Sequence, residues 1–103
     1  MILKKYFKDS NATVDFVFDF AGLRNSTGYK DYLEYGETIS SAVAISSSAD
    51  LVITATNVIK NDTAVQVWLT GGVAGVVYTL TARITTSLNR IDDRSISIQV
   101  DNL

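Results

Sequence analysis

Two pairs of aspartates are the first residues whose chemistry could be catalytic. Asp92 and Asp93 are adjacent, and Asp15 and Asp19 lie four residues apart. Adjacent side chains of a strand point to opposite faces, so Asp92 and Asp93 would not share one proton or one metal ion. Four residues of strand span about 13 Å, which is more than the roughly 5 to 9.5 Å between the paired carboxylates of glycosidases. Neither pair predicts an active site.

The neighbours of the adjacent pair favour a structural role. Arg90 and Arg94 stand on either side of Asp92 and Asp93. Opposite charges at such short spacing are ready partners for charge-assisted hydrogen bonds. We therefore expect an ion-pair cluster beside a hairpin rather than acid–base chemistry.

Other chemistry-bearing patterns are missing or incomplete. The chain has no histidine and no cysteine, which removes the usual nucleophile–base pairs and nearly all zinc sites. Gly71 to Gly75 is rich in glycine, but it lacks the lysine and hydroxyl residue that end a phosphate-binding loop, so we expect a corner between strands. Asp9 to Asn11 and Asn57 to Asp62 lack the spacing of a calcium-binding EF-hand loop. We expect no catalytic residue, no cofactor and no metal ion.

Aromatic side chains suggest contact with other proteins instead. Trp68 lies on the opposite face of its predicted strand from Val67 and Leu69, where it is either an exposed anchor or covered by a loop. Several more large aromatics lie outside the predicted core, which is many for a free monomer. The candidate interface residues are Tyr6, Phe7, Tyr29, Tyr32, Tyr35, Trp68, Arg90, Asp92 and Asp93. We expect the arm from Met1 to Phe7 and the segment from Ala21 to Gly36 to contact neighbouring chains.

The elements that would position these residues are predicted by alternation with a period of two. Residues 13–20 place their apolar side chains on one face and mainly acidic side chains on the other, which is typical of a half-buried strand. A helix would scatter the same residues around its circumference. The apolar face consists of Val14, Phe16, Phe18 and Phe20.

Similar segments follow at 39–45, 51–56, 64–70, 76–86 and 91–100, and 3–7 could add an edge strand. Turn-forming residues separate them, and the chain contains no proline. About seven short strands at this spacing predict an all-β fold, specifically an immunoglobulin-like antiparallel β-sandwich. Tyr78 lies two residues before the apolar Leu80, as in the tyrosine corner of such domains. We expect one domain over residues 1–103, with 1–10 as an N-terminal arm or edge strand.

The composition excludes some classes of partner. A chain of 103 residues with a formal net charge of −2 has neither the basic patch of a nucleic-acid-binding protein nor a polybasic membrane anchor. Without cysteine, no disulfide can stabilise the fold. The first residues lack the apolar run of a secretion signal, so we expect synthesis in the cytoplasm.

The C-terminal half resembles a known family of small phage proteins, the fiber-tail adaptors. The resemblance is strongest in the segment WLTGGVAGVVYTLTARITT, from Trp68 to Thr86, and in RIDDRSISIQV, from Arg90 to Val100. Lys8 to Ala12, Tyr32-Leu33 and Gly36-Glu37-Thr38-Ile39 are similar to further family motifs. Ser10 stands where the family usually has proline, and Phe20 and Tyr32 where it has tryptophan, which could alter the choice of partner.

The resemblance implies a virion structural protein that is made in the host cytoplasm. It would link the phage tail or baseplate to the tail fibres, in several copies within a symmetric assembly. Two alternatives remain at this point. One is an immunoglobulin-like domain that decorates the capsid or belongs to a head fibre. The other is a carbohydrate-binding module that uses Trp68 and tyrosines as stacking platforms.

Overall fold

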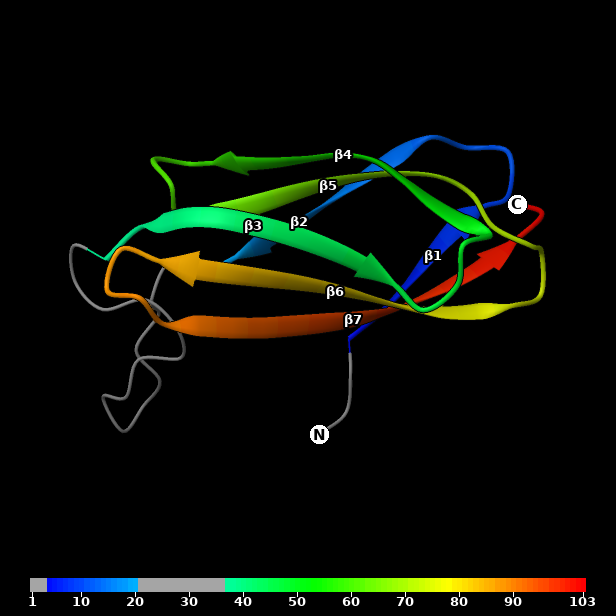
Figure 1. Cartoon of the computed structure of the whole chain (residues 1–103). Helices are drawn as coiled ribbons and strands as arrows, with labels where there is room; N and C mark the ends of the chain where they lie inside the picture. The colour runs from blue at the N-terminus through cyan, green and yellow to red at the C-terminus, as the bar shows by residue number, and fades with distance from the viewer. Residues whose placement is uncertain (1–3, 21–36) are drawn as a thin grey trace, which may run out of the picture.

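The computed structural model describes residues 4–20 and 37–103, and within them the chain folds into seven strands in two layers (Figure 1). The strands are β1 (Lys5–Asp9), β2 (Val14–Asp19), β3 (Ile39–Ser46), β4 (Leu51–Ile59), β5 (Ala64–Gly71), β6 (Val77–Thr86) and β7 (Ile91–Asp101). These two ranges contain no helix. Nothing in them therefore forms a helix long and apolar enough to cross a membrane.

The strand order is that of an immunoglobulin-like sandwich, which confirms the predicted fold class. One sheet has the order β1-β7-β6-β3, and the other has the order β2-β5-β4. All pairs are antiparallel except the edge strand β1, which runs parallel to β7 from Lys5 opposite Ser97 to Asp9 opposite Asp101. The N-terminal strand and the C-terminal strand therefore lie side by side.

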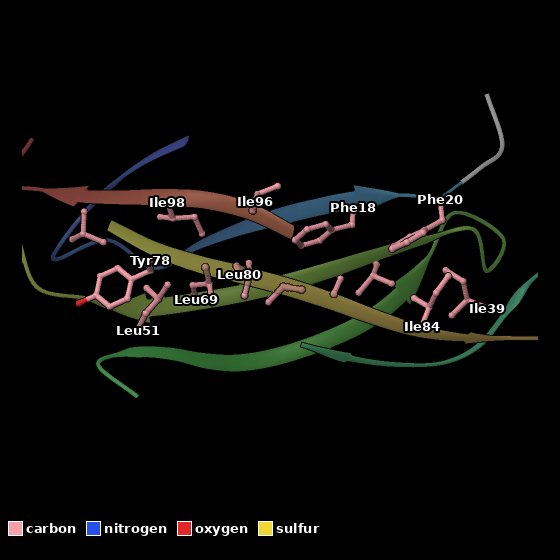
Figure 2. Close-up of a cluster of buried hydrophobic side chains, with 14 residues drawn as sticks. Phe18, Phe20, Ile39, Leu51, Leu69, Tyr78, Leu80, Ile84, Ile96 and Ile98 are labelled. Carbon is pink, nitrogen blue, oxygen red and sulfur yellow. The ribbon is translucent and has the colours of Figure 1, made fainter. Parts of the chain in front are cut away.

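The core fills the space between the sheets with side chains from both (Figure 2). The alternation predicted from the sequence is confirmed in β2, β5, β6 and β7, where the inward residues are buried or, for Val14 and Phe16, half-buried. The fully or almost fully buried apolar side chains are Phe18, Phe20, Val65, Val67, Leu69, Tyr78, Leu80, Ala82, Ile84, Ile96, Ile98 and Val100, together with Ile39, Leu51 and Ala64. At roughly 1.5–3 kcal/mol for each large apolar side chain, this burial is the main source of stability.

The glycine-rich segment forms the corner between β5 and β6, as expected. Gly71 and Gly72 have φ angles of 80° and 94°, which favour glycine. A Cβ atom at Gly71 would lie 2.9 Å from the carbonyl oxygen of Asp50. The N–H of Val73 donates to the phenolic oxygen of buried Tyr78 at 2.8 Å. Tyr78 is therefore a tyrosine corner, in which the hydroxyl ties the start of β6 to the preceding loop.

In strand β3, the larger apolar side chains of the predicted segment 39–45 do not all face the core. The register shifts between Ile39 and Ser41, where an extra residue enters the pairing with β6. Such a bulge reverses which residues face the core. Ile39 is therefore buried, Ala42 and Ala44 face inward, and the larger Val43 and Ile45 face the solvent.

A buried lysine connects the two sheets. Lys8 of β1 is only 2% exposed, and its ammonium group donates to the carbonyl oxygens of Asp9 at 2.8 Å and Gly71 at 2.7 Å. Gly71 ends β5 in the other sheet. Burial lowers the pKa of the Lys8 ammonium, and the neighbouring Asp9 partly opposes this shift. The side chain fastens the edge strand β1 to the opposite layer.

Candidate functional site

Four parts of the chain meet at one end of the sandwich, which is on the left in Figure 1. They are the β4–β5 turn (60–63), the β6–β7 turn (87–90), and the two described residues that flank the segment 21–36, Phe20 and Glu37. The N–H of Phe20 donates to the carbonyl of Thr63 at 2.9 Å, and that of Ile39 donates to the carbonyl of Asp62 at 2.8 Å. We call these residues (20, 37–39, 60–63 and 87–91) the loop end.

The β4–β5 turn has a well-defined backbone. Lys60, Asn61 and Asp62 all have left-handed φ angles, of 55°, 55° and 62°. Asparagine and aspartate tolerate this region better than most residues. The hydroxyl of Thr63 donates to the carbonyl of Lys60 at 2.6 Å and closes the turn. The turn can therefore hold both Phe20 and Ile39 in place.

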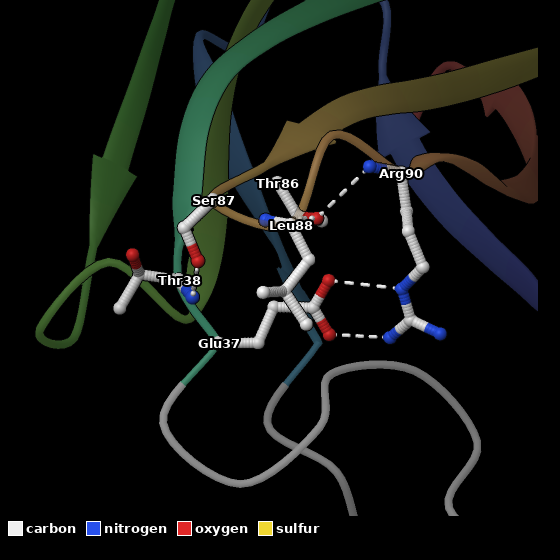
Figure 3. A network of polar contacts seen from close by, with 6 residues as sticks. All are labelled: Glu37, Thr38, Thr86, Ser87, Leu88 and Arg90. Carbon is white, nitrogen blue, oxygen red and sulfur yellow. Dashed lines mark hydrogen bonds and ion pairs between the residues drawn. The ribbon is translucent and has the colours of Figure 1, made fainter.

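An ion pair between the buried Glu37 and the partly exposed Arg90 fastens Glu37 to the β6–β7 turn (Figure 3). The Glu37 side chain is fully buried, and its carboxylate accepts two hydrogen bonds from the guanidinium group of Arg90. The Nε–Oε2 distance is 3.0 Å, and Nη2 donates to Oε1. Next to this pair, the N–H of Ser87 donates to the carbonyl of Thr38 at 2.8 Å, and the N–H of Thr38 donates to the hydroxyl of Ser87 at 3.0 Å.

The β6–β7 turn is itself held by a buried hydroxyl group. The Oγ1 of Thr86 accepts hydrogen bonds from the N–H groups of Leu88 at 3.3 Å and Arg90 at 3.2 Å. Asn89 has the left-handed φ angle of 61° that such a tight turn needs. The turn presents Leu88, which is 57% exposed, and leads into Ile91, which is 68% exposed.

The loop end carries two exposed apolar side chains, Leu88 and Ile91, on a turn with defined hydrogen bonds. The Glu37–Arg90 ion pair and the buried hydroxyl of Thr86 both make hydrogen bonds to this turn. Loops on a rigid scaffold are the usual place for binding residues. In immunoglobulin variable domains, the loops at one end of the sandwich form the binding site.

The aspartate pair lies beside the loop end, at the start of β7, and its ion pairs differ from the expected ones. Asp93 lies opposite Arg83 of β6, and its carboxylate accepts hydrogen bonds from Nε at 2.8 Å and Nη2 at 2.9 Å. Arg90 binds Glu37 instead, and Arg94 donates to the carbonyl of Asp19 in the other sheet at 2.9 Å. Neighbours in a strand face opposite sides, so cross-strand position decides the partner of Asp93.

The Arg83–Asp93 pair predicts a small loss of stability in acid. Hydrogen bonds from Arg83 lower the pKa of Asp93 below the ordinary aspartate value of about 3.9. Because its pKa is lowered, the Asp93 carboxylate contributes to the free energy of unfolding above about pH 4. This contribution disappears as the pH falls through the folded-state pKa of Asp93. The difference in unfolding free energy between wild type and Asp93→Asn, measured by urea titration, should therefore be constant from pH 5 to 7 and shrink below pH 4. A difference that grows in acid would contradict this assignment.

A comparison with protein families gives a match over most of the chain. The family model described as "Podophage GP4 fiber-tail adaptor protein gp77" matches residues 8–99. The chain belongs to this family. A search of curated proteins found no match.

The matched range of the fiber-tail adaptor family begins at Lys8, and it contains the loop end together with the ion pairs described above. Glu37 and Arg90 lie in two separate segments that resemble family motifs, and the structure shows that they bind each other. The sequence singled out Arg90 but missed Glu37, Thr86, Leu88 and Ile91. The segment 36–39 resembles a family motif, and this resemblance was the available sequence signal for Glu37.

Of the other candidate interface residues, Tyr6 and Phe7 of β1 and Trp68 of β5 are described by the structure of this adaptor-family chain, and they lie apart from the loop end. Phe7 is 58% exposed on the outer face of β1, whereas Tyr6 packs edge-on against Phe16, with a centroid distance of 5.4 Å. Trp68 is half-buried on the outer face of β5, opposite Asp15. Residues 1–3 and 21–36, which include Tyr29, Tyr32 and Tyr35, lie outside the described residues.

Proposed function

We propose that this protein is a non-catalytic part of a phage virion that connects the tail or baseplate to the tail fibres through protein–protein contacts. Its membership of the fiber-tail adaptor family carries this proposal. The name of that family describes an adaptor between fibre and tail, which needs at least one surface for another virion protein. We also propose synthesis in the host cytoplasm followed by assembly into the tail.

The loop end is the surface that the structure supports best for such a contact. Leu88 and Ile91 project from a turn whose backbone is fixed by Thr86 and by the Glu37–Arg90 pair. A turn whose backbone is already held in one conformation loses little backbone entropy on binding. In the sequence, the segment 21–36 follows Phe20 and precedes Glu37, and both of these flanking residues belong to the loop end.

The introduction of negative charge at the two apolar side chains of this turn should impair assembly. We expect the double substitution Leu88→Asp with Ile91→Asp to lower incorporation into particles at least about tenfold, because replacement of a hot-spot residue at an interface costs about 2 kcal/mol or more. Complementation of a phage that lacks the gene, followed by quantification of the protein in purified particles, measures the effect. Stability should change little, since both side chains are exposed in the isolated chain.

Val73→Asp is the matched control. Val73 is 50% exposed, but it lies in the β5–β6 corner at the other end of the sandwich. Incorporation of this variant should stay near the wild-type level. Normal incorporation of the Leu88 and Ile91 double variant, or an equal defect in Val73→Asp, would show that the loop end is not the assembly contact.

A further inference from the structure

Trp68 is the only tryptophan of the chain, and it lies on the outer face of β5, the central strand of the three-stranded sheet. Its neighbours Val67 and Leu69 face the core and are buried, whereas Trp68 itself is half-buried. The residues directly opposite it are Asp15 of β2 and Ala55 of β4. Neither directly opposite position therefore supplies a large side chain that would cover the indole ring.

The indole N–H group of Trp68 is free to bind a ligand. Within residues 4–20 and 37–103, it has no hydrogen-bond partner. The same part of the chain has no polar side-chain atom that is buried without a partner, so this N–H group is reachable from the solvent. An indole combines an apolar ring with a single hydrogen-bond donor. Trp68 therefore offers both at one point of the sheet.

Three planar polar side chains cross the sheet beside Trp68. Gln66, two residues before Trp68 on the same face, donates through Nε2 to Oδ2 of Asp15 at 2.9 Å. The Oε1 atom of Gln66 accepts a hydrogen bond from Nδ2 of Asn57 at 3.4 Å. These bonds hold the three groups side by side. They leave Oδ1 of Asp15 and Oδ1 of Asn57 without a partner among the described residues.

The other side of the indole ring is bordered by hydroxyl groups, and the face carries little charge. Thr70 follows Trp68 on the outer face, and its Oγ1 accepts a hydrogen bond from Oγ1 of Thr13 at 3.2 Å. The only charged residues within β2, β4 and β5 are Asp15 and Asp19. Lys60 lies 3.9 Å from Asp19, which leaves Asp15 as the one carboxylate of these strands without a basic partner.

The mixture of donors and acceptors around Trp68 indicates the class of ligand. A guanidinium or ammonium group offers donors only, so it could bind Asp15 but not the indole N–H. Asp15 would repel a phosphate or carboxylate group. A purely apolar partner would remove these polar groups from water without replacing their hydrogen bonds. A sugar ring has an apolar C–H face bordered by hydroxyl groups that both donate and accept, and it matches all of these groups.

We propose that the outer face of the three-stranded sheet binds a neutral saccharide, with one sugar ring stacked on the indole of Trp68. The hydroxyl groups of the ring bond to the indole N–H, to Oδ1 of Asp15 and to the amide of Asn57. Gln66 does not need to touch the sugar, because it positions both Asp15 and Asn57. Side chains that already hold one another lose little freedom on binding. This inference does not depend on the adaptor role, whose proposed contact is the loop end.

The fluorescence of Trp68 tests the proposal directly, because no other tryptophan contributes to the signal. The purified full chain is titrated with D-glucose, D-galactose, N-acetyl-D-glucosamine and maltotetraose. At least one of these sugars should change the emission saturably, with a dissociation constant of roughly 1–10 mM, as expected for one stacked ring and a few hydrogen bonds that compete with water. The absence of saturable binding for all four sugars would overturn the proposal.

Two glutamine variants form a matched pair for the same titration. Gln99 donates to Asp101 at 3.0 Å, as Gln66 does to Asp15, but it lies on β7 in the other sheet. Gln66→Ala should weaken sugar binding about fivefold, because Asp15 and Asn57 lose the residue that positions them, and Gln99→Ala should leave it unchanged. Equal effects of the two variants would contradict the site.

Titration calorimetry with Trp68→Ala supplies the second measurement, and urea denaturation shows whether this variant folds. Sugar binding should disappear in folded Trp68→Ala, and binding that survives there would overturn the proposal. Should Trp68→Ala fail to fold, Asn57→Ala decides instead, since Asn57 is exposed, and wild-type affinity of that variant would count against the site. If no sugar binds but Trp68→Ala blocks incorporation into particles, the face contacts a protein and the saccharide proposal is wrong.

Discussion

Replacement of Lys8 by alanine should lower the free energy of unfolding by about 3 kcal/mol, measured by urea denaturation. The side chain is almost fully buried, and its ammonium group bonds to two carbonyl oxygens, one of them in the opposite sheet. Alanine would leave a cavity where the aliphatic stem packs, and it would leave the carbonyl oxygens of Asp9 and Gly71 without this donor. Both effects oppose folding.

Lys8→Met separates these two effects, because methionine keeps most of the stem and removes the charge. We expect Lys8→Met to lose less than half of what Lys8→Ala loses, since removal of the buried charge also removes its desolvation cost. An exposed lysine elsewhere on the same strand, Lys5, provides the control, and Lys5→Ala should change the unfolding free energy by no more than about 0.5 kcal/mol. Equal, small effects of the Lys8 and Lys5 variants would contradict the role of Lys8 as a clamp between the sheets.

The burial of Lys8 also predicts a pH dependence. Because burial lowers the pKa of Lys8 in the folded state, the unfolded state binds more protons between that pKa and the ordinary value of about 10.4. Stability from this group therefore rises as the pH increases through that interval. The stability of wild type relative to Lys8→Met should accordingly increase towards pH 10, and a decrease would contradict the assignment.

Replacement of Glu37 by alanine should lower the free energy of unfolding by about 2 kcal/mol and loosen the loop end. Breaking a buried ion pair commonly costs 3–5 kcal/mol when the remaining charge stays buried. Here Arg90 remains 42% exposed and can be hydrated, so the expected cost is smaller. Hydrogen exchange should accelerate in the turn 87–90, because the Glu37–Arg90 pair no longer holds it.

A double-mutant cycle with Arg90→Ala tests whether the two residues act through each other. The cycle should give a coupling energy of at least about 1 kcal/mol, because the two residues are in direct contact. Because the turn presents Leu88 and Ile91, Glu37→Ala should also reduce incorporation into particles. Additive effects of Glu37→Ala and Arg90→Ala, with unchanged exchange in the turn, would show that the pair does not fix the loop end.

Much of the fold could be predicted because alternation in a strand is a direct consequence of having a core on one side. The four apolar residues of the segment 13–20 and the inward residues of 76–86 and 91–100 followed that rule. Strand β3 did not, because the bulge after Ile39 changes the register, and the sequence ISSAVAIS has no glycine or proline that marks it. The tyrosine corner was predictable because both its spacing and its position after a glycine-rich turn are local.

The candidate site was harder to predict, because its contacts join residues that are distant in the sequence. Asp93 binds Arg83 across a hairpin, and Arg90 binds Glu37, which is 53 residues away. Charge and spacing alone pointed to flanking residues instead. A glutamate is seldom fully buried unless it is paired. Because the distant partner Arg90 was not known from the sequence, composition and periodicity did not identify Glu37 as part of the site.

The most direct test of the adaptor account is a reconstruction of the assembled phage particle with this chain placed in it. The account predicts density for the sandwich at the junction of tail and fibres, with the turns 60–63 and 87–90 against a neighbouring virion protein. Density for the chain on the capsid surface, or at the tail with the loop end facing solvent, would contradict it.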